Sequence, residues 1–399
     1  MSSDHADEAL PLLRVPADGV PDVIDTTRGL KEAAEVLASG TGSVAVDAER
    51  ASGFRYGQRA FLVQLRREGA GTLLIDPEPF DDLAVLDDAL RGSEWVLHAS
   101  TQDLPCLSDL DMKPDALFDT ELAARFLGFE RFGLAAVVGE TVGVRLAKEH
   151  SAVDWSTRPL PDSWLSYAAL DVEVLLEVAD RLDAQLQSTG LAEYAQQEFE
   201  HLLGFTPTVH EEPWRRMNGL GSLKVPRQLA RARELWLSRD RIAAHNDAAP
   251  SRILRDRDAV TLAQNRVRTA DDVFRVLGTG RLTRRHAQRW ADALVRADSL
   301  PEAELPRRSR STSPGRRLDR ALVKERTESF KQGMRELSAS TGIPHDLLLQ
   351  PALVRSAATL RDPADPDVLL AFLTDEGARE WQRELSFPVL LAAARSVKG

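Results

Sequence analysis

The segment from Val44 to Leu65 constrains the fold more than any other part of this chain. It opens with the apolar run Val-Ala-Val and continues into Asp47-Ala-Glu49, which is the pattern of a buried strand that ends in two acids. Successive strand side chains point to opposite faces, so Asp47 and Glu49 share one face and their carboxylates converge. Converging carboxylates favour a cation. Two acids at the solvated end of an ordinary strand would give the same pattern, so a site needs partners elsewhere in the chain.

Composition excludes several classes of protein. The length of 399 residues favours two or three domains, and 43% hydrophobic with 28% charged residues is typical of a protein with real cores. The net charge of -11 argues against a surface coated in cation for wholesale nucleic-acid binding. A local basic surface is compatible with it, because electrostatic steering depends on where charges lie. Cys106 is the single cysteine, which excludes an internal disulfide and a cysteine cage for a metal.

The N-terminal residues are acidic and lack the basic, apolar and small-residue regions of a secretory signal. No apolar run approaches the ~18 residues that are needed to span a bilayer. We therefore expect a cytoplasmic protein with no membrane association, and we expect it to be a monomer.

The pattern of the first part of the chain favours an α/β fold. A helix is predicted over 27–38, and the strand at Val44 is followed by strands over 61–66 and 72–76 in an antiparallel meander. Helices then alternate with a short buried strand over 94–98, which adds parallel members to a mixed sheet. A long helix is predicted over 161–187, with Gly190 as its stop.

Beyond Pro226 we find no convincing strand, and two all-helical blocks of similar length suggest a diverged duplication. In chain order we predict a leader over 1–25, an α/β domain over 26–200, a linker over 201–225, a first helical block over 226–298, a flexible linker over 299–316 and a second helical block over 317–399. The linker over 299–316 is rich in Pro, Ser and Arg, a composition typical of mobile segments.

Three further polar residues lie where the chain changes direction. Asp103 follows the strand over 94–98 at the start of a helix. Tyr167 and Asp171 are one turn apart on the long helix, so both project from the same face. Apolar residues on that helix would anchor it against the sheet, which places Tyr167 and Asp171 near the rim of the sheet.

In this order and at these intervals, Asp47-x-Glu49, Asp103 and Tyr167-x-x-x-Asp171 resemble the three motifs of the DEDD 3'-to-5' exonucleases, in the subgroup whose third motif carries Tyr. Other segments are similar to ribonuclease D: Val63-Gln64-Leu65, Leu74-Ile75-Asp76-Pro77, His98-x-x-x-x-Asp103-Leu104, Phe118-Asp119-Thr120 and Asp154-Trp155-x-x-Arg158-Pro159-Leu160. The first helical block resembles the HRDC domain shared by RecQ-type helicases and ribonuclease D, and the second is similar to a weaker copy of it. The resemblance implies a ribonuclease H-like exonuclease domain followed by two small all-α domains.

Four carboxylates without Cys or His are hard ligands, which suit Mg²⁺ or Mn²⁺ and suit zinc poorly. Packed together without cations, they should have raised pKa values. The resemblance implies two divalent ions, with Asp47 bridging both, Glu49 and Asp171 beside the attacking water, and Asp103 on the second ion. Tyr167 would orient that water.

The resemblance further implies a 3'-5' exoribonuclease that releases nucleoside 5'-monophosphates from a free 3' end, with tRNA precursors and other structured RNAs as substrates. Candidate substrate contacts are Arg55, Tyr56, Gln64, His98, Trp155 and Arg158. Several have a structural alternative: the Arg-rich loop over 50–59 could be a solvated loop, Trp155 could pack in the core, His98 could position the turn before Asp103, and Arg158 could form a structural ion pair.

Arginine runs in the first helical block could be solvated helix faces or an RNA track: Arg227, Arg231, Arg233, Arg239 and Arg241 on one helix, then Arg281, Arg284, Arg285 and Arg289 on another. In many relatives an aromatic residue stands where this chain has Arg50, and Ala48 lies between the first two acids. A DNA exonuclease stays open as an alternative, because nothing in the motifs reads the 2'-hydroxyl. A non-catalytic RNA-binding scaffold is a further alternative, against which the intact set of four acids and Tyr167 weighs heavily. The chain has no Gly-x-Ser-x-Gly turn, so a serine hydrolase is unsupported.

Overall fold

The computed structural model describes residues 10–147, 152–280, 282–307 and 319–397. Two compact units divide the chain. The first comprises Met1–Glu49, Ala60–Thr206 and Gly315–Gly399, and the second comprises Arg50–Arg59 and Pro207–Pro314. The second helical block predicted over 317–399 thus belongs to the same unit as the α/β domain.

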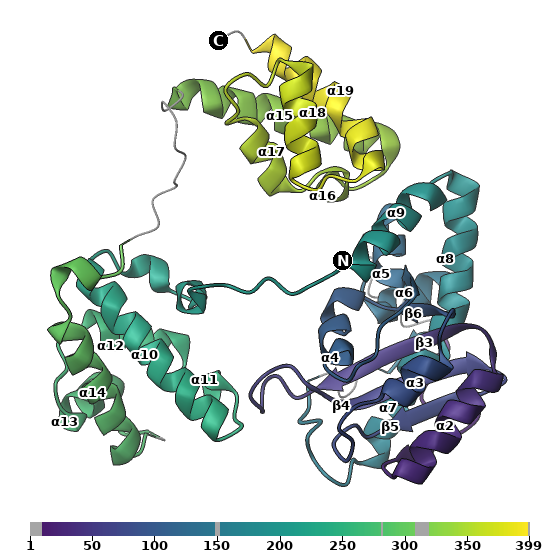
Figure 1. Cartoon of the computed structure of the whole chain (residues 1–399), viewed down its shortest axis with the longest axis horizontal. Coiled ribbons are helices and arrows are strands. Elements are labelled where there is room, and N and C mark those ends of the chain that lie inside the picture. The colour runs from purple at the N-terminus through teal and green to yellow at the C-terminus, as the bar shows by residue number, and fades with distance from the viewer. Residues whose placement is uncertain (1–9, 148–151, 281, 308–318, 398–399) are drawn as a thin grey trace. The chain divides into compact units, whose positions relative to one another are not determined.

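A six-stranded sheet forms the centre of the α/β domain (Figure 1). In sheet order its strands are β2 (Val23–Ile24), β5 (Gly71–Ile75), β4 (Ala60–Glu68), β3 (Thr41–Arg50), β6 (Glu94–Leu97) and β7 (Ala116–Asp119). β4 and β5 are antiparallel, whereas β6 pairs in parallel with both β3 and β7. The sheet is therefore mixed and flanked by helices, as the sequence predicts.

The predicted leader over 1–25 contributes two short strands. Val23 and Ile24 of β2 pair in parallel with β5, and β1 (Leu12–Leu13) pairs in parallel with β8 (Arg145–Leu146). A strand of two residues shows no alternation, so the sequence pattern carried no signal for either. Residues 1–9 of the leader lie outside the described residues, as do residues 308–316 of the predicted linker over 299–316.

Helices cover both faces of the sheet. Those of the α/β domain are α2 (Thr27–Ser39), α3 (Ala84–Ala89), α4 (Leu104–Ser108), α5 (Thr120–Phe126), α6 (Leu134–Thr141), α7 (Asp162–Glu173), α8 (Leu175–Thr189) and α9 (Ala192–Leu203). The helix predicted over 161–187 is in fact two helices, α7 and α8, which meet at Val174. No Pro or Gly marks that boundary, so the apolar periodicity runs through it unbroken.

Alternation along β3 separates the two faces of the sheet. Val44, Val46 and Ala48 pack in one core with residues of α2 and α3, whereas Ala45 packs in the other core with residues of α5 and α8. Side chains two residues apart share a face, so Asp47 and Glu49 lie on the side of Ala45. The period-two argument from the sequence is confirmed here.

The C-terminal block shares a hydrophobic core with the α/β domain. Its helices are α15 (Arg320–Thr341), α16 (His345–Leu348), α17 (Pro351–Ala357), α18 (Pro366–Asp375) and α19 (Glu380–Ser396). Phe118 and Phe199 of the α/β domain and Phe330 and Trp381 of the block belong to one cluster of buried residues. The sequence predicted a separate domain for this block, because periodicity shows that a helix has an apolar face but does not show what covers that face.

The second unit contains the first helical block. Its helices are α10 (Pro226–His245), α11 (Pro250–Ile253), α12 (Asp256–Gln264), α13 (Ala270–Leu277) and α14 (Arg284–Ser299), around a core that includes Leu235 and Trp290. No strand lies beyond residue 226 in the described part of the chain. The described residues also include no helix that is both long enough and apolar enough to cross a membrane.

Candidate active site

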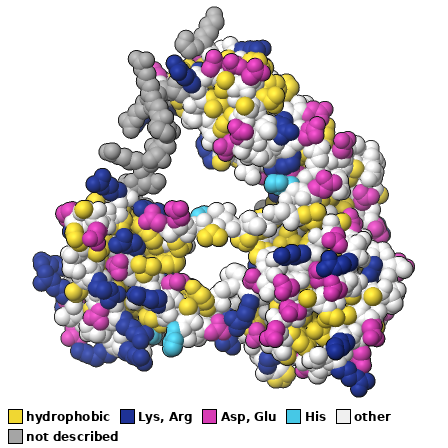
Figure 2. Space-filling view, viewed as in Figure 1, with side chains coloured by type: hydrophobic (Ala, Val, Ile, Leu, Met, Phe, Trp, Pro, Cys, Tyr) yellow, Lys and Arg dark blue, Asp and Glu magenta, His cyan; other side chains and the backbone are white. Residues whose placement is uncertain are grey.

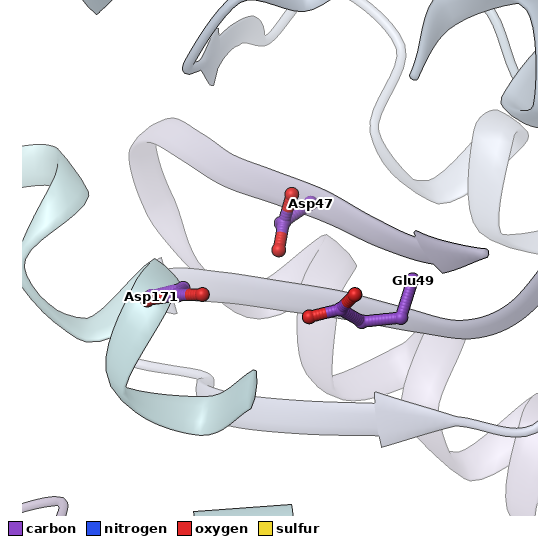
Figure 3. Close-up of side chains that lie close together, drawn as sticks. All are labelled: Asp47, Glu49 and Asp171. Atoms are coloured by element: carbon purple, nitrogen blue, oxygen red, sulfur yellow. The ribbon is translucent and has the colours of Figure 1, made fainter. Parts of the chain in front are cut away.

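Three carboxylates meet where β3 ends beneath α7. Asp47 and Glu49 lie on β3 and Asp171 lies on α7, and one carboxylate oxygen from each lies within 4.8 Å of the other two. Figure 3 shows the three side chains turned toward one another from the strand and the helix. The structure therefore brings together two residues and a third that is more than one hundred positions away, as the sequence motifs predicted.

Small residues allow α7 to approach the sheet closely. Ala168 and Ala169 are fully buried on this helix, which contacts β4 and β5. Asp171 is only 9% exposed, so the helix carries an acid into an apolar interface. Burial of an ionised carboxylate is costly unless a cation or hydrogen-bond donors compensate it.

Burial raises the pKa of Asp171 well above its usual value, and the neighbouring Asp47 carboxylate raises it further. A hydrogen bond with the Tyr167 hydroxyl acts in the opposite direction. Burial also raises the pKa of Tyr167, with contributions from Asp171, Glu49 and Asp47. Tyr167 therefore keeps its proton and acts as a hydrogen-bond donor at the edge of the three acids.

Asp103 is not one of the three acids that meet within 4.8 Å. It is buried between the 3-10 turn η1 (Ser100–Gln102) and α4, with 4% of its surface exposed. The turn is held by Asp119, whose carboxylate accepts hydrogen bonds from the backbone N–H groups of Ala99 at 3.2 Å and Ser100 at 2.8 Å. Asp119 is thus a positioning residue. The motif Phe118-Asp119-Thr120 contains it but did not predict this role.

His98 lies in the strand-to-turn segment that precedes Asp103. Its Nδ1 is 2.9 Å from the Thr120 hydroxyl, which in turn donates to the Leu97 carbonyl. Burial lowers the pKa of His98, so the ring is neutral near pH 7. These contacts agree with the structural alternative, in which His98 positions the turn.

Trp155 and Arg158 build the wall beside Tyr167. Trp155 is fully buried, with its ring centroid 6.4 Å from that of Tyr167. Arg158 binds both carboxylate oxygens of Asp76, at 2.5 and 2.8 Å, and also donates to the Phe61 carbonyl. Arg158 therefore forms the structural ion pair named as its alternative, and Trp155 has no exposed face on which a base could stack.

Gln64 is fully buried on β4. Val63 and Leu65 pack on the side of α2 and α3, so Gln64 points to the opposite face of the sheet. Among the described residues, neither polar atom of its side chain has a hydrogen-bond partner. A fully buried side chain cannot contact substrate directly in this conformation.

Arg55 and Tyr56 belong to the second unit. The Tyr56 hydroxyl donates to Asp240 at 3.1 Å, and Arg55 and Arg59 both contact Asp247, Arg59 at 2.9 Å. The hydrogen bond from Arg59 makes the largest contribution to the lowered pKa of Asp247. The loop over 50–59 is therefore neither free nor simply solvated, because Arg55 and Arg59 share Asp247 and Tyr56 contacts Asp240 of the first helical block.

Replacing Asp247 by Asn tests this packing. Asn tolerates the left-handed backbone of residue 247, whose φ is 44°, but removes the charge. We expect amide hydrogen exchange over residues 50–59 to become several-fold faster while α10 keeps its protection. Unchanged exchange in the loop would show that Asp247 does not hold it.

Most arginines on α10 have structural partners. Arg231 pairs with Asp298 at 2.7 Å, Arg239 is 7% exposed and pairs with Asp256 at 2.6 Å, and Arg227 donates to the Leu300 carbonyl at 2.6 Å. The predicted RNA track along α10 is therefore reduced to its C-terminal end, where Arg241 lines a groove with Arg289 of α14. Figure 2 shows Arg side chains on the surface of this block. Arg281 lies outside the described residues.

The donor set of the cluster fits a hard divalent cation. All three groups offer carboxylate oxygens, which suit Mg²⁺ and Mn²⁺, and neither His nor Cys belongs to the cluster. The raised pKa of Asp171 has the direction expected of acids that are crowded without a cation.

Comparison with known protein families defines the class of protein. A family model described as 3'-5' exonuclease matches residues 21–187, and another described as 3' to 5' exonuclease C-terminal domain matches residues 321–394. The second match covers the C-terminal block, in agreement with the core that this block shares with the α/β domain. The domain is thus a 3'-5' exonuclease domain, and the acidic cluster fits a metal site.

Individual relatives are more specific. Ribonuclease D of Sphingobium indicum is 31% identical over 291 residues, which cover 70% of this chain and 74% of that protein. A crystal structure of a protein from Bifidobacterium adolescentis superposes with a TM-score of 0.85 at 35% identity, covering 97% of this chain and 100% of the other. Ribonuclease D of Escherichia coli shares the fold, with a TM-score of 0.70 at 23% identity over 95% and 99% of the two chains.

The chain belongs to the ribonuclease D family. It is a 3'-5' exoribonuclease, as the sequence motifs predicted.

Proposed function

We propose that Asp47, Glu49 and Asp171, with Asp103, hold two divalent cations, Mg²⁺ or Mn²⁺. When bound, such ions neutralise the acids and stabilise the charge that develops on the attacking and leaving oxygens. The family resemblance implies that Asp47 would help to hold both cations, and in this structure its carboxylate is close enough to Asp171 to raise the pKa of that acid. The observation that carries the proposal is the convergence of three carboxylates within 4.8 Å, with Tyr167 beside them.

The proposed reaction is hydrolysis of the terminal phosphodiester. Water adds to phosphorus, the bond between phosphorus and the 3' oxygen of the preceding nucleotide breaks, and that oxygen takes up a proton. The products are a nucleoside 5'-monophosphate and an RNA shortened by one residue. Tyr167 orients the attacking water through its hydroxyl group, and Trp155 packs beside the Tyr167 ring.

The proposed substrates are tRNA precursors and other structured RNAs with a free 3' end, digested by a cytoplasmic monomer. The groove between Arg241 and Arg289 supports a role of the first helical block in RNA binding. Preference for RNA over DNA belongs to the same proposal, and matched RNA and DNA oligonucleotides test it.

Digestion of end-labelled RNA tests polarity and product together. With Mg²⁺ or Mn²⁺ present, RNA labelled at its 5' end should yield a ladder of shortening fragments. RNA labelled at its 3' end should release labelled mononucleotide from the earliest time point. Early release of mononucleotide from the 5'-labelled end would contradict the proposed polarity.

Replacing Tyr167 by Phe keeps the ring and removes the hydroxyl. We expect kcat to fall by about 100-fold, the lower end of the range for loss of a positioned group that assists proton transfer, with KM almost unchanged. Steady-state kinetics on a short RNA measure both constants. Tyr194→Phe, which removes a hydroxyl from α9 outside the acidic cluster, serves as the control. An unaltered kcat in Tyr167→Phe would show that the hydroxyl has no role in the reaction.

A further inference from the structure

A groove of about 710 Å³ lies in the first unit, where the C-terminal block meets the α/β domain. Thr101 and Gln102 of the η1 turn line one side, Glu121 of α5 lies between, and Gln350 and Arg355 of the C-terminal block line the other. Ligand pockets typically measure about 300 to 1,000 Å³, so a nucleotide fits this volume.

Ala99, Thr101 and Gln102, which line the groove, belong to the segment that connects β6 to Asp103, and β6 lies next to β3 in the sheet. Gln102 directly precedes Asp103 in the chain, and consecutive Cα atoms are about 3.8 Å apart. A strand that occupies the groove therefore passes the turn that carries the fourth acid.

Most charged side chains around the groove already form ion pairs or hydrogen bonds. Two of the ion pairs link the α/β domain to the C-terminal block. Arg379 contacts both carboxylate oxygens of Glu198, at 2.5 and 2.6 Å, and Arg125 contacts Asp346 at 2.6 Å. The carboxylate of Asp119 accepts from backbone N–H groups of the η1 turn. None of these groups needs a ligand to satisfy its charge.

Arg355 is the exception. It is exposed in the last turn of α17, and among the described residues no acid pairs with it. Glu121 also lines the groove and has no ion pair in the described part of the chain, and burial is the main cause that raises its pKa. The hydroxyl of Thr101 and the amides of Gln102 and Gln350 complete a polar lining that carries no charge of its own.

We propose that this groove holds the substrate strand upstream of the scissile bond, with Arg355 binding a backbone phosphate and the amides facing the bases. The guanidinium group suits phosphate because its donors match two phosphate oxygens. This inference rests on the proposed function and extends it, since it gives the C-terminal block a direct contact with RNA. An acidic protein partner would also meet Arg355, but amides and a hydroxyl beside a single cation fit a nucleotide better.

Kinetics on RNA of different lengths test the assignment. Arg355→Ala should raise KM for an eight-nucleotide RNA by about tenfold, the loss of one charge-assisted hydrogen bond, with kcat unchanged. Arg355→Glu should raise it further, and Arg355→Lys should recover part of the loss because it keeps the charge. A dinucleotide lacks the upstream phosphates that the groove is proposed to hold, so its kcat/KM should stay within about twofold of wild type in all three variants.

Arg361→Glu is the matched control, because Arg361 is an exposed arginine of the same block that does not line the groove. Equal KM values for wild type and Arg355→Glu on the eight-nucleotide RNA would overturn the inference and leave the proposed function standing. An equal loss in Arg361→Glu would also overturn it, since the effect would then reflect overall charge. If the wild-type protein digests no RNA, the proposed function fails first and this inference fails with it.

Discussion

Replacing Asp47 or Asp171 by Asn is expected to lower the rate of RNA digestion by about 10³-fold or more, because each change removes a charge and an oxygen ligand that act at the reacting phosphate. Asn has nearly the same shape as Asp, so the fold should persist. Single-turnover digestion of an end-labelled RNA measures the loss. Asp183→Asn, an exposed acid on α8, is the control and should digest RNA at the wild-type rate.

The Asp171→Asn variant should also differ from wild type in thermal stability. Folding raises the pKa of Asp171 above its unfolded value, so above that unfolded pKa the ionised carboxylate destabilises the fold of the metal-free protein. Asp171→Asn removes this cost, and its Tm without metal at pH 7 should be higher than that of wild type. A lower Tm would indicate that the variant loses activity through unfolding and would contradict the assigned role.

The second large effect concerns the junction between α9 and the C-terminal block. Glu198 is buried, accepts from Arg379, and receives the Trp381 ring N–H at 2.7 Å. Glu198→Gln leaves the Arg379 guanidinium without its counter-ion, a change that costs about 3 to 5 kcal/mol when the pair is buried. We expect a fall of that size in the free energy of unfolding of the first unit.

Denaturant unfolding followed by tryptophan fluorescence measures this change. The exposed Glu193 lies on the same helix, so Glu193→Gln controls for the loss of a negative charge. If Glu198→Gln unfolds at the wild-type denaturant concentration, the C-terminal block does not depend on this junction, and the shared core around Trp381 does not couple the two parts.

Much of the candidate site could be predicted from the sequence because the spacing of its residues matches the repeat of a strand or of a helix. Alternation along β3 put Asp47 and Glu49 on one face, and the one-turn spacing of Tyr167 and Asp171 put both on one side of α7. That the strand and the helix converge came from the family resemblance, since no local period carries a contact between residues so far apart. Once the strand and the helix converge, the three carboxylates must lie close together.

What the sequence did not predict consists of long-range contacts. Arg158 forms an ion pair with Asp76, which lies 82 residues earlier in the chain. The loop over 50–59 contacts Asp240 and Asp247, which lie almost two hundred residues later. Each of these charged residues looks like a solvated or substrate-binding group when only its neighbours in the chain are considered. The shared core of the C-terminal block was missed for the same reason, because an apolar helix face does not specify its partner.

Removal of divalent metal is the most direct test of the central claim that the Asp47, Glu49 and Asp171 cluster is a catalytic cation site. Protein treated with a chelator and then dialysed should not shorten a 5'-labelled RNA, and added Mg²⁺ or Mn²⁺ should restore digestion in a saturable way. The Asp171→Asn variant should not recover at the same metal concentrations. Full activity of wild-type protein in excess chelator would contradict the account.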